Sequence, residues 1–152
     1  MSHTLKQYYE YVVGMSLLLF AISLSLYPFA PSSEAAFIAE YHLKAPVGLS
    51  FSVFVSLIIF IITSILYFSS DSFVGNLFIE SSGLSMIILN YLNYYAIAET
   101  WHPIMFPIPL FIYIKYNGTA ALQFDWGQVG IIILLYRYYK FTKNPPPFIK
   151  SR

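Results

Sequence analysis

Residues 80–103 read ESSGLSMIILNYLNYYAIAETWHP, a run of apolar and aromatic side chains that begins and ends in polar residues. The interval 81–98 contains no charged residue, and Glu80 and Glu99 stand directly outside it. A helix rises about 1.5 Å per residue, so about 20 residues cover a hydrocarbon core about 30 Å thick. The stretch predicts a transmembrane helix over 81–101, and we expect the other helices to pack around it.

The composition of the whole chain agrees with a membrane location. Only 10% of the 152 residues are charged, 58% are hydrophobic, and the mean hydropathy is +0.65. A soluble domain of this size with so few charges would not stay in solution, so we expect a multi-pass protein of the cell membrane. The sequence has no cysteine, which excludes disulfides and thiolate metal sites. The composition also suits a thermophilic, archaeal-like membrane.

Three further apolar stretches predict crossings at 11–29, 47–70 and 119–139. The first ends at Pro28 and Pro31, because proline supplies no backbone N–H donor. The last is read from Thr119 or, in a shorter version, from Trp126. The predicted fold class is therefore an all-α membrane protein with four transmembrane helices in one domain, 1–152.

Two segments between these crossings are less regular. Residues 33–43 begin with Ser33 and Glu34, while Lys44 and Pro46 mark a stop, so the pattern predicts a short interfacial helix. Residues 104–114 are apolar but interrupted by Pro107 and Pro109. We interpret them as a re-entrant or interfacial segment, or as a short fifth crossing that other chains shield. The sequence leaves open whether there are four or five crossings, and on which side of the membrane the N-terminus lies.

The charge distribution predicts the side of the C-terminus. Five of the eight basic residues lie within the last sixteen positions, and no acid follows Asp125. Cytoplasmic segments carry an excess of Lys and Arg, so we expect a basic cytoplasmic tail at 140–152.

One candidate functional site combines the end of the 81–101 helix with the 33–43 linker, because both lie on the same side of the membrane in either topology. Spacings of four, four and three place four of its residues on one helix face. A cluster of this kind could bind a quinone headgroup, a metal or a proton. The alternative is that these side chains only anchor helix ends at the interface. The residues are Tyr91, Tyr95, Glu99 and His102 from the helix, with Glu40 and His42 from the linker.

Four other polar residues are candidates for structural roles or for modification. Asn90 and Asn93 lie one turn apart, and we expect their amides to join helices within the chain or between subunits. Asp125 is either a helix cap at the membrane edge or a buried intramembrane acid. Asn117 begins a glycosylation sequon, which counts only if its loop is external.

The sequence has no phosphate-binding glycine loop, no HExxH and no Gly-x-Ser-x-Gly, and we predict no catalytic residues and no resident metal. In general character, Tyr-rich, cysteine-free and built from short crossings, it is similar to small accessory subunits of archaeal respiratory complexes, and less so to four-helix quinone-linked oxidoreductase subunits. We therefore expect a non-catalytic subunit of a larger respiratory or electron-transport assembly, a terminal oxidase or a quinol-linked complex.

Its expected partners are other integral membrane subunits and lipids, with no nucleic acid. We expect no cofactor of its own, while haem or quinone would belong to partner subunits. One alternative is a small proton- or solute-conducting membrane protein. The other is a quinone-binding oxidoreductase subunit that uses Tyr95, Glu99, His102 and His42.

Overall fold

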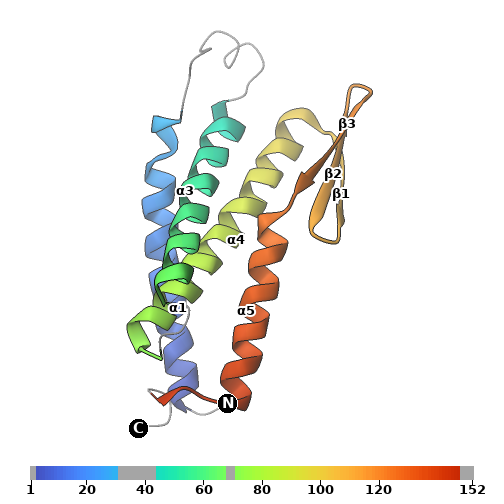
Figure 1. Cartoon of the computed structure of the whole chain (residues 1–152). Coiled ribbons are helices and arrows are strands. Elements are labelled where there is room, and N and C mark those ends of the chain that lie inside the picture. The colour runs from blue at the N-terminus through green and yellow to red at the C-terminus, as the bar shows by residue number, and fades with distance from the viewer. Residues whose placement is uncertain (1–2, 31–43, 68–70, 148–152) are drawn as a thin grey trace.

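The computed structural model describes residues 3–30, 44–67 and 71–147. These residues form a bundle of long helices with a small sheet at one end (Figure 1). The helices are α1 (His3–Ser25), η1 (Tyr27–Phe29, a 3-10 turn), α3 (Lys44–Tyr67), α4 (Phe73–Trp101) and α5 (Trp126–Lys143). The strands are β1 (Ile104–Ile108), β2 (Phe111–Tyr116) and β3 (Thr119–Phe124).

Helix α4 is the central element of the bundle and contacts α1, α3 and α5. It begins where the Ser72 hydroxyl accepts a hydrogen bond from the Gly75 N–H at 3.0 Å. It ends at His102, whose φ of 48° is left-handed, and at the proline that follows. Many of its buried residues are small, which lets neighbouring helices approach closely: Gly75, Ser81, Ser82, Gly83 and Ser85.

The sheet is an antiparallel meander in the order β1-β2-β3. Asn117 and Gly118 connect β2 to β3 with φ values of 47° and 81°, as a two-residue type I′ hairpin requires. Leu110 completes the β1–β2 turn with a φ of 66°. Within the described residues, Ile112 is the sheet's one buried hydrophobic side chain. The sheet is therefore attached to the bundle mainly through its ends.

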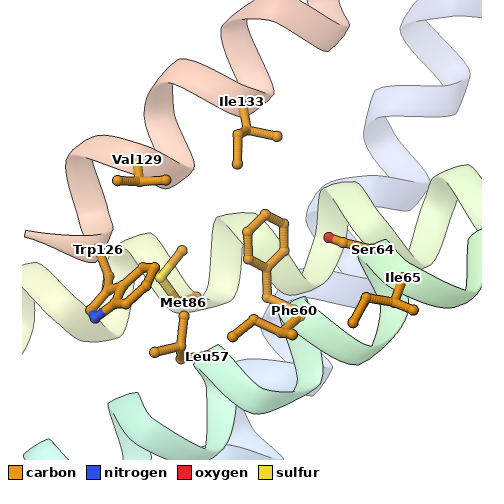
Figure 2. A pocket seen from close by; sticks show the side chains of 9 residues that line it. Leu57, Phe60, Ser64, Ile65, Met86, Trp126, Val129 and Ile133 are labelled. Carbon is orange, nitrogen blue, oxygen red and sulfur yellow. The ribbon is translucent and has the colours of Figure 1, made fainter. Parts of the chain in front are cut away.

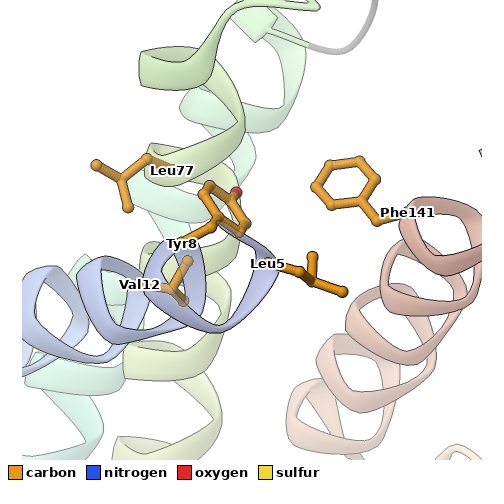
Figure 3. Close-up of a cluster of buried hydrophobic side chains, with 5 residues drawn as sticks. All are labelled: Leu5, Tyr8, Val12, Leu77 and Phe141. Atoms are coloured by element: carbon orange, nitrogen blue, oxygen red, sulfur yellow. The ribbon is translucent and has the colours of Figure 1, made fainter. Parts of the chain in front are cut away.

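Helix α5 runs back along α4 and meets α1 at the end of the bundle opposite to the sheet (Figure 1). There Leu5, Tyr8 and Val12 of α1 pack with Leu77 of α4 and Phe141 of α5 (Figure 3). Burying this apolar cluster fixes the N-terminal part of α1 beside the C-terminal part of α5.

Among the described residues, three helices are long and apolar enough to cross a membrane: Leu5–Phe29, Pro46–Tyr67 and Phe73–Trp101. The first and second correspond to the crossings expected at 11–29 and 47–70. The third begins eight residues before the expected 81–101, so the segment 71–80 is mostly helix and Glu80 lies inside α4. Helix α5 is less apolar than these three, because it contains Arg137, Lys140 and Lys143.

The structure corrects two expectations about the C-terminal half. Residues 119–124 are strand β3, so a helix over 119–139 is wrong at its start. Helix α5 begins at Trp126, the start given for the shorter version, and extends into the tail, to Lys143. Residues 104–108 belong to β1 and 111–114 to β2, so this segment is not a helix and the fold is not all-α. The helix expected at 33–43 lies outside the described residues.

Candidate functional site

Asp125 is the centre of a buried polar cluster between α4 and α5. It precedes the first residue of α5, and its Oδ1 accepts hydrogen bonds from the N–H groups of Gly127 at 2.9 Å and Gln128 at 3.3 Å. Asn90 of α4 donates to the same oxygen at 2.8 Å. The side chain is 1% exposed. A carboxylate at a helix N-terminus stabilises the unpaired N–H groups there, and here it also joins two helices.

Side chains also bind the second oxygen of the Asp125 carboxylate. Gln128 Nε2 lies 3.1 Å from Oδ2, and the Tyr91 hydroxyl lies 3.5 Å from it. Each carboxylate oxygen therefore has donors from the chain itself. A carboxylate whose donors are all intramolecular is suited to hold structure.

Gln128 connects this cluster to the turn between β1 and β2. Its Oε1 accepts from the Leu110 N–H at 2.9 Å, and its Nε2 donates to the carbonyls of Ile108 at 3.0 Å and Phe111 at 3.1 Å. The main-chain N–H of Asp125 donates to the Leu110 carbonyl at 2.9 Å. The Gln128 amide thus makes hydrogen bonds that the main chain of this turn would otherwise make with solvent.

A second charged contact lies towards the other end of α4. Glu80 Oε1 is 3.4 Å from Arg137 Nε, and the two side chains are 4% and 16% exposed. Asn76 Oδ1 accepts a hydrogen bond from the same guanidinium at 2.5 Å, and the Tyr8 hydroxyl interacts with the Glu80 carboxylate. The guanidinium also lies 5.3 Å from the ring centre of Phe141. Opposite charges that are removed from water together in this way fix the register of α4 against α5.

Sequence reasoning missed this ion pair because it placed Glu80 at the end of a crossing and counted Arg137 only as a topology signal. The available signal was Ser72 with its preceding Asp71, a helix start that brings Glu80 two turns into the helix. An acid inside a membrane helix predicts a basic partner on a neighbouring helix.

Polar side chains also join α3 to α4 along their length. Asn93 and Ser50 contact each other at 3.1 Å, Thr63 and Ser82 at 2.9 Å. The expected packing pair thus has two different partners: Asn93 faces α3, while Asn90 faces the N-terminus of α5.

The quinone, metal or proton site expected at the end of α4 is not assembled among the described residues. Tyr95 is 62% exposed, and Glu99 and His102 are exposed as well. Of this set, Tyr91 alone contacts the Asp125 cluster, at the 3.5 Å given above. Glu40 and His42 lie outside the described residues, and within those residues no three His, Asp or Glu side chains group as metal ligands would. Asn117 lies exposed in the β2–β3 turn.

The cavity in Figure 2 is apolar and separate from both charged clusters. It lies between α3, α4 and α5 and has a volume of about 220 Å³. Phe60, Met86, Trp126 and Ile133 line it, and Ser64 is a polar residue at its border. With no charged side chain in its wall, the cavity suits a hydrocarbon group.

Three buried hydroxyl groups, those of Tyr9, Ser23 and Tyr94, have no hydrogen-bond partner within the described residues. Tyr9 and Ser23 belong to α1, fourteen residues apart, and Tyr94 belongs to α4.

Comparisons of the chain with protein family models, with curated proteins and with solved structures found no match in any of the three.

Proposed function

We propose that this chain is a non-catalytic membrane subunit that packs against other integral membrane subunits of a larger complex. The observation that carries the proposal is the use of its two buried carboxylates. Asp125 is bound by Asn90, Gln128 and main-chain N–H groups, and Glu80 by Arg137. Acids that conduct protons or hold a ligand need an accessible side, whereas these are occupied by the chain's own donors.

The exposed surface supports the second half of the proposal, that other chains cover this one. Large apolar side chains are exposed on α1, α3 and α5 and on both outer strands, among them Leu17, Ile65, Leu135, Ile104 and Leu122. Lipid can cover the helices. Wherever a free edge of a sheet faces lipid, it needs protein beside it, because lipid offers no hydrogen bonds to the main chain.

The most specific form of the proposal is an accessory subunit of a respiratory complex of the terminal oxidase or quinol-linked type, with haem or quinone in the partner subunits. Its basis is the Tyr-rich, cysteine-free composition of a small, apolar chain. In this form the C-terminal end of α5, with Lys140 and Lys143, faces the cytoplasm.

The test is gentle detergent extraction from the native membrane, followed by native mass determination, identification of each co-purifying chain, and a visible spectrum. We expect a particle of fixed stoichiometry that contains haem- or copper-bearing subunits. A chain that purifies alone or with copies of itself, without chromophore, would contradict the proposal.

A pair of variants separates this function from quinone or proton chemistry at the end of α4. Glu99→Gln with His102→Ala should leave the turnover of the particle nearly unchanged, because both side chains are exposed. Asn90→Leu with Asn93→Leu should reduce the yield of assembled particle, because it removes the contacts to Asp125 and Ser50. The reverse result would favour the quinone or proton function.

A further inference from the structure

The sheet has two outer strands, and the structure distinguishes them sharply. Within the described residues, β1 and β3 each pair only with β2. The outer main-chain groups of such strands are a ready template for another strand, and proteins usually block them with proline, charge or cover.

The direction of the main-chain groups of β3 follows from one hydrogen bond. The N–H of Asp125 donates to Leu110, next to β2, at 2.9 Å. Main-chain groups of successive strand residues point alternately to the two sides, so residues 119, 121 and 123 also face β2. The pairing of Tyr116 with Thr119 across the two-residue turn gives the same alternation. The N–H and C=O groups of Ala120, Leu122 and Phe124 therefore point away from the sheet.

The same reasoning applied to β1 gives a blocked edge. Ile108 pairs with Phe111 across the other two-residue turn, so residues 104, 106 and 108 face β2, while Met105 and Pro107 face outward. Pro107 has no N–H to offer, which is how outer strands are commonly closed. Strand β3 contains no proline and no charged residue, and all six of its residues are exposed. Among the strands that the structure describes, the β3 edge is thus the one open to pairing.

We propose that the outer edge of β3 pairs with an extended, uncharged segment of a different subunit, which adds a fourth strand to the sheet. This inference rests on the proposed function and names the mode of contact. The outward N–H and C=O groups of Ala120, Leu122 and Phe124 are the main-chain groups that the added strand would bind. Leu122 and Phe124, 58% and 37% exposed, offer apolar side chains to alternate residues of the incoming strand.

A second copy of this chain fits the edge less well. Two identical antiparallel strands are related by a two-fold axis perpendicular to their sheet. The strands run roughly in the direction of the helices (Figure 1), so that axis would lie in the membrane plane. The second copy would then be inverted across the membrane, against the charge bias of its tail.

Hydrogen exchange at single-residue resolution tests the proposal on the native particle and on the chain purified alone. In the particle, the amides of Ala120, Leu122 and Phe124 should exchange at least about tenfold more slowly than in the isolated chain. The amides of Ala121 and Gln123, which face β2, should be slow in both samples. The amide of Met105 controls for shielding by detergent, since it points outward on the blocked edge and should exchange fast in both.

A matched pair of proline variants provides the second measurement. Leu122→Pro removes an outward N–H without removing a bond to β2, and it should lower the yield of assembled particle several-fold. Met105→Pro makes the same change on the β1 edge and should leave the yield unchanged. Equal yields from the two variants would overturn the proposal.

The outcomes also separate the inference from the proposed function. A multi-subunit particle whose Ala120, Leu122 and Phe124 amides exchange as in the isolated chain refutes the strand pairing and leaves the subunit function standing. A chain that purifies without other subunits refutes both. Slow exchange in a homodimer, with a disulfide formed by Leu122→Cys in this cysteine-free chain, assigns the edge to a second copy and overturns the choice of partner.

Discussion

Glu80 and Arg137 form their ion pair between two helices, with both side chains largely buried, so each charge depends on the other. Arg137 Nε lies 3.4 Å from the carboxylate, and Asn76 binds the same guanidinium. The net contribution of a buried pair to stability is small, because desolvation offsets the attraction, but loss of one partner leaves the other charge buried and unpaired. The pair is therefore expected to fix the packing of α4 against α5 more than to stabilise it.

Arg137→Met should lower the free energy of unfolding by about 3 to 5 kcal/mol, since it leaves Glu80 without its cation. The double variant Glu80→Leu with Arg137→Met should recover most of this loss, because both charges are gone. Denaturation of the purified chain in detergent, followed by circular dichroism, measures both. A double variant as unstable as Arg137→Met would contradict the assignment of the loss to an unpaired Glu80.

At the scale of elements, the hairpin was within reach of sequence reasoning and the attachment of the sheet was not. Asn117 and Gly118 follow FIYIKY, a run rich in β-forming residues, and an Asn-Gly pair in such a place is the strongest short-range sign of a two-residue hairpin. The apolar character of 104–114 favoured a membrane segment instead. The contacts of Gln128 depend on a turn that is 17 to 20 residues away, and no local pattern predicts them.

The membrane helices, in contrast, follow from hydropathy alone, because each must satisfy its own main chain. Hydropathy does not give their partners. Asn90 and Asn93 were expected to join helices, but only the fold shows that one meets Asp125 and the other Ser50. The 81–101 boundary was short by eight residues because Glu80 was read as the polar end of the crossing.

Gln128→Leu should detach the β1–β2 turn from α5 while leaving the bundle intact. The variant removes the acceptor for Leu110 and the donor to the carbonyls of Ile108 and Phe111. Limited proteolysis should then cut within 104–124 faster than in the original chain, with helical content unchanged. Gln123→Leu, at an exposed position of β3, is the matched control. Equal protection of the two variants would show that Gln128 does not hold the turn.

The contact of α4 with α5 depends on Gly130, which lies against Met86 and Ile87. A Cβ at this position would come within 2.7 Å of Met86 Cε and 2.8 Å of Ile87 Cγ1. Gly130→Val should therefore push the helices apart and lower the free energy of unfolding by about 1 to 3 kcal/mol. Gly14→Val makes the same change on α1, where nothing lies within 4 Å, and should have a much smaller effect. Similar losses for both would point to helix propensity instead of packing.

At the scale of the whole molecule, two contacts fix the course of α5 relative to the membrane helices. Asp125 meets Asn90 at the start of α5, and Arg137 meets Asn76 near its end. The α4 positions 90 and 76 are about 20 Å apart at 1.5 Å per residue, so the part of α5 between these contacts runs along about half of α4. Leu5 and Phe141 lie in one cluster (Figure 3), which puts the start of α1 and the end of α5 at the same end of the bundle.

We therefore expect α5 to complete a fourth crossing despite its basic residues, with its cationic end at the cytoplasmic interface. Single-cysteine variants test this, because the chain has no cysteine of its own. A membrane-impermeant maleimide should label Thr142→Cys and Lys6→Cys only from the cytoplasmic side, and Asn117→Cys only from the outside. If Thr142→Cys and Asn117→Cys react from the same side, α5 returns without crossing and three helices span the membrane. In that case the ion pair of Arg137 with Glu80 would have to break, and the Arg137→Met variant would lose its effect on stability.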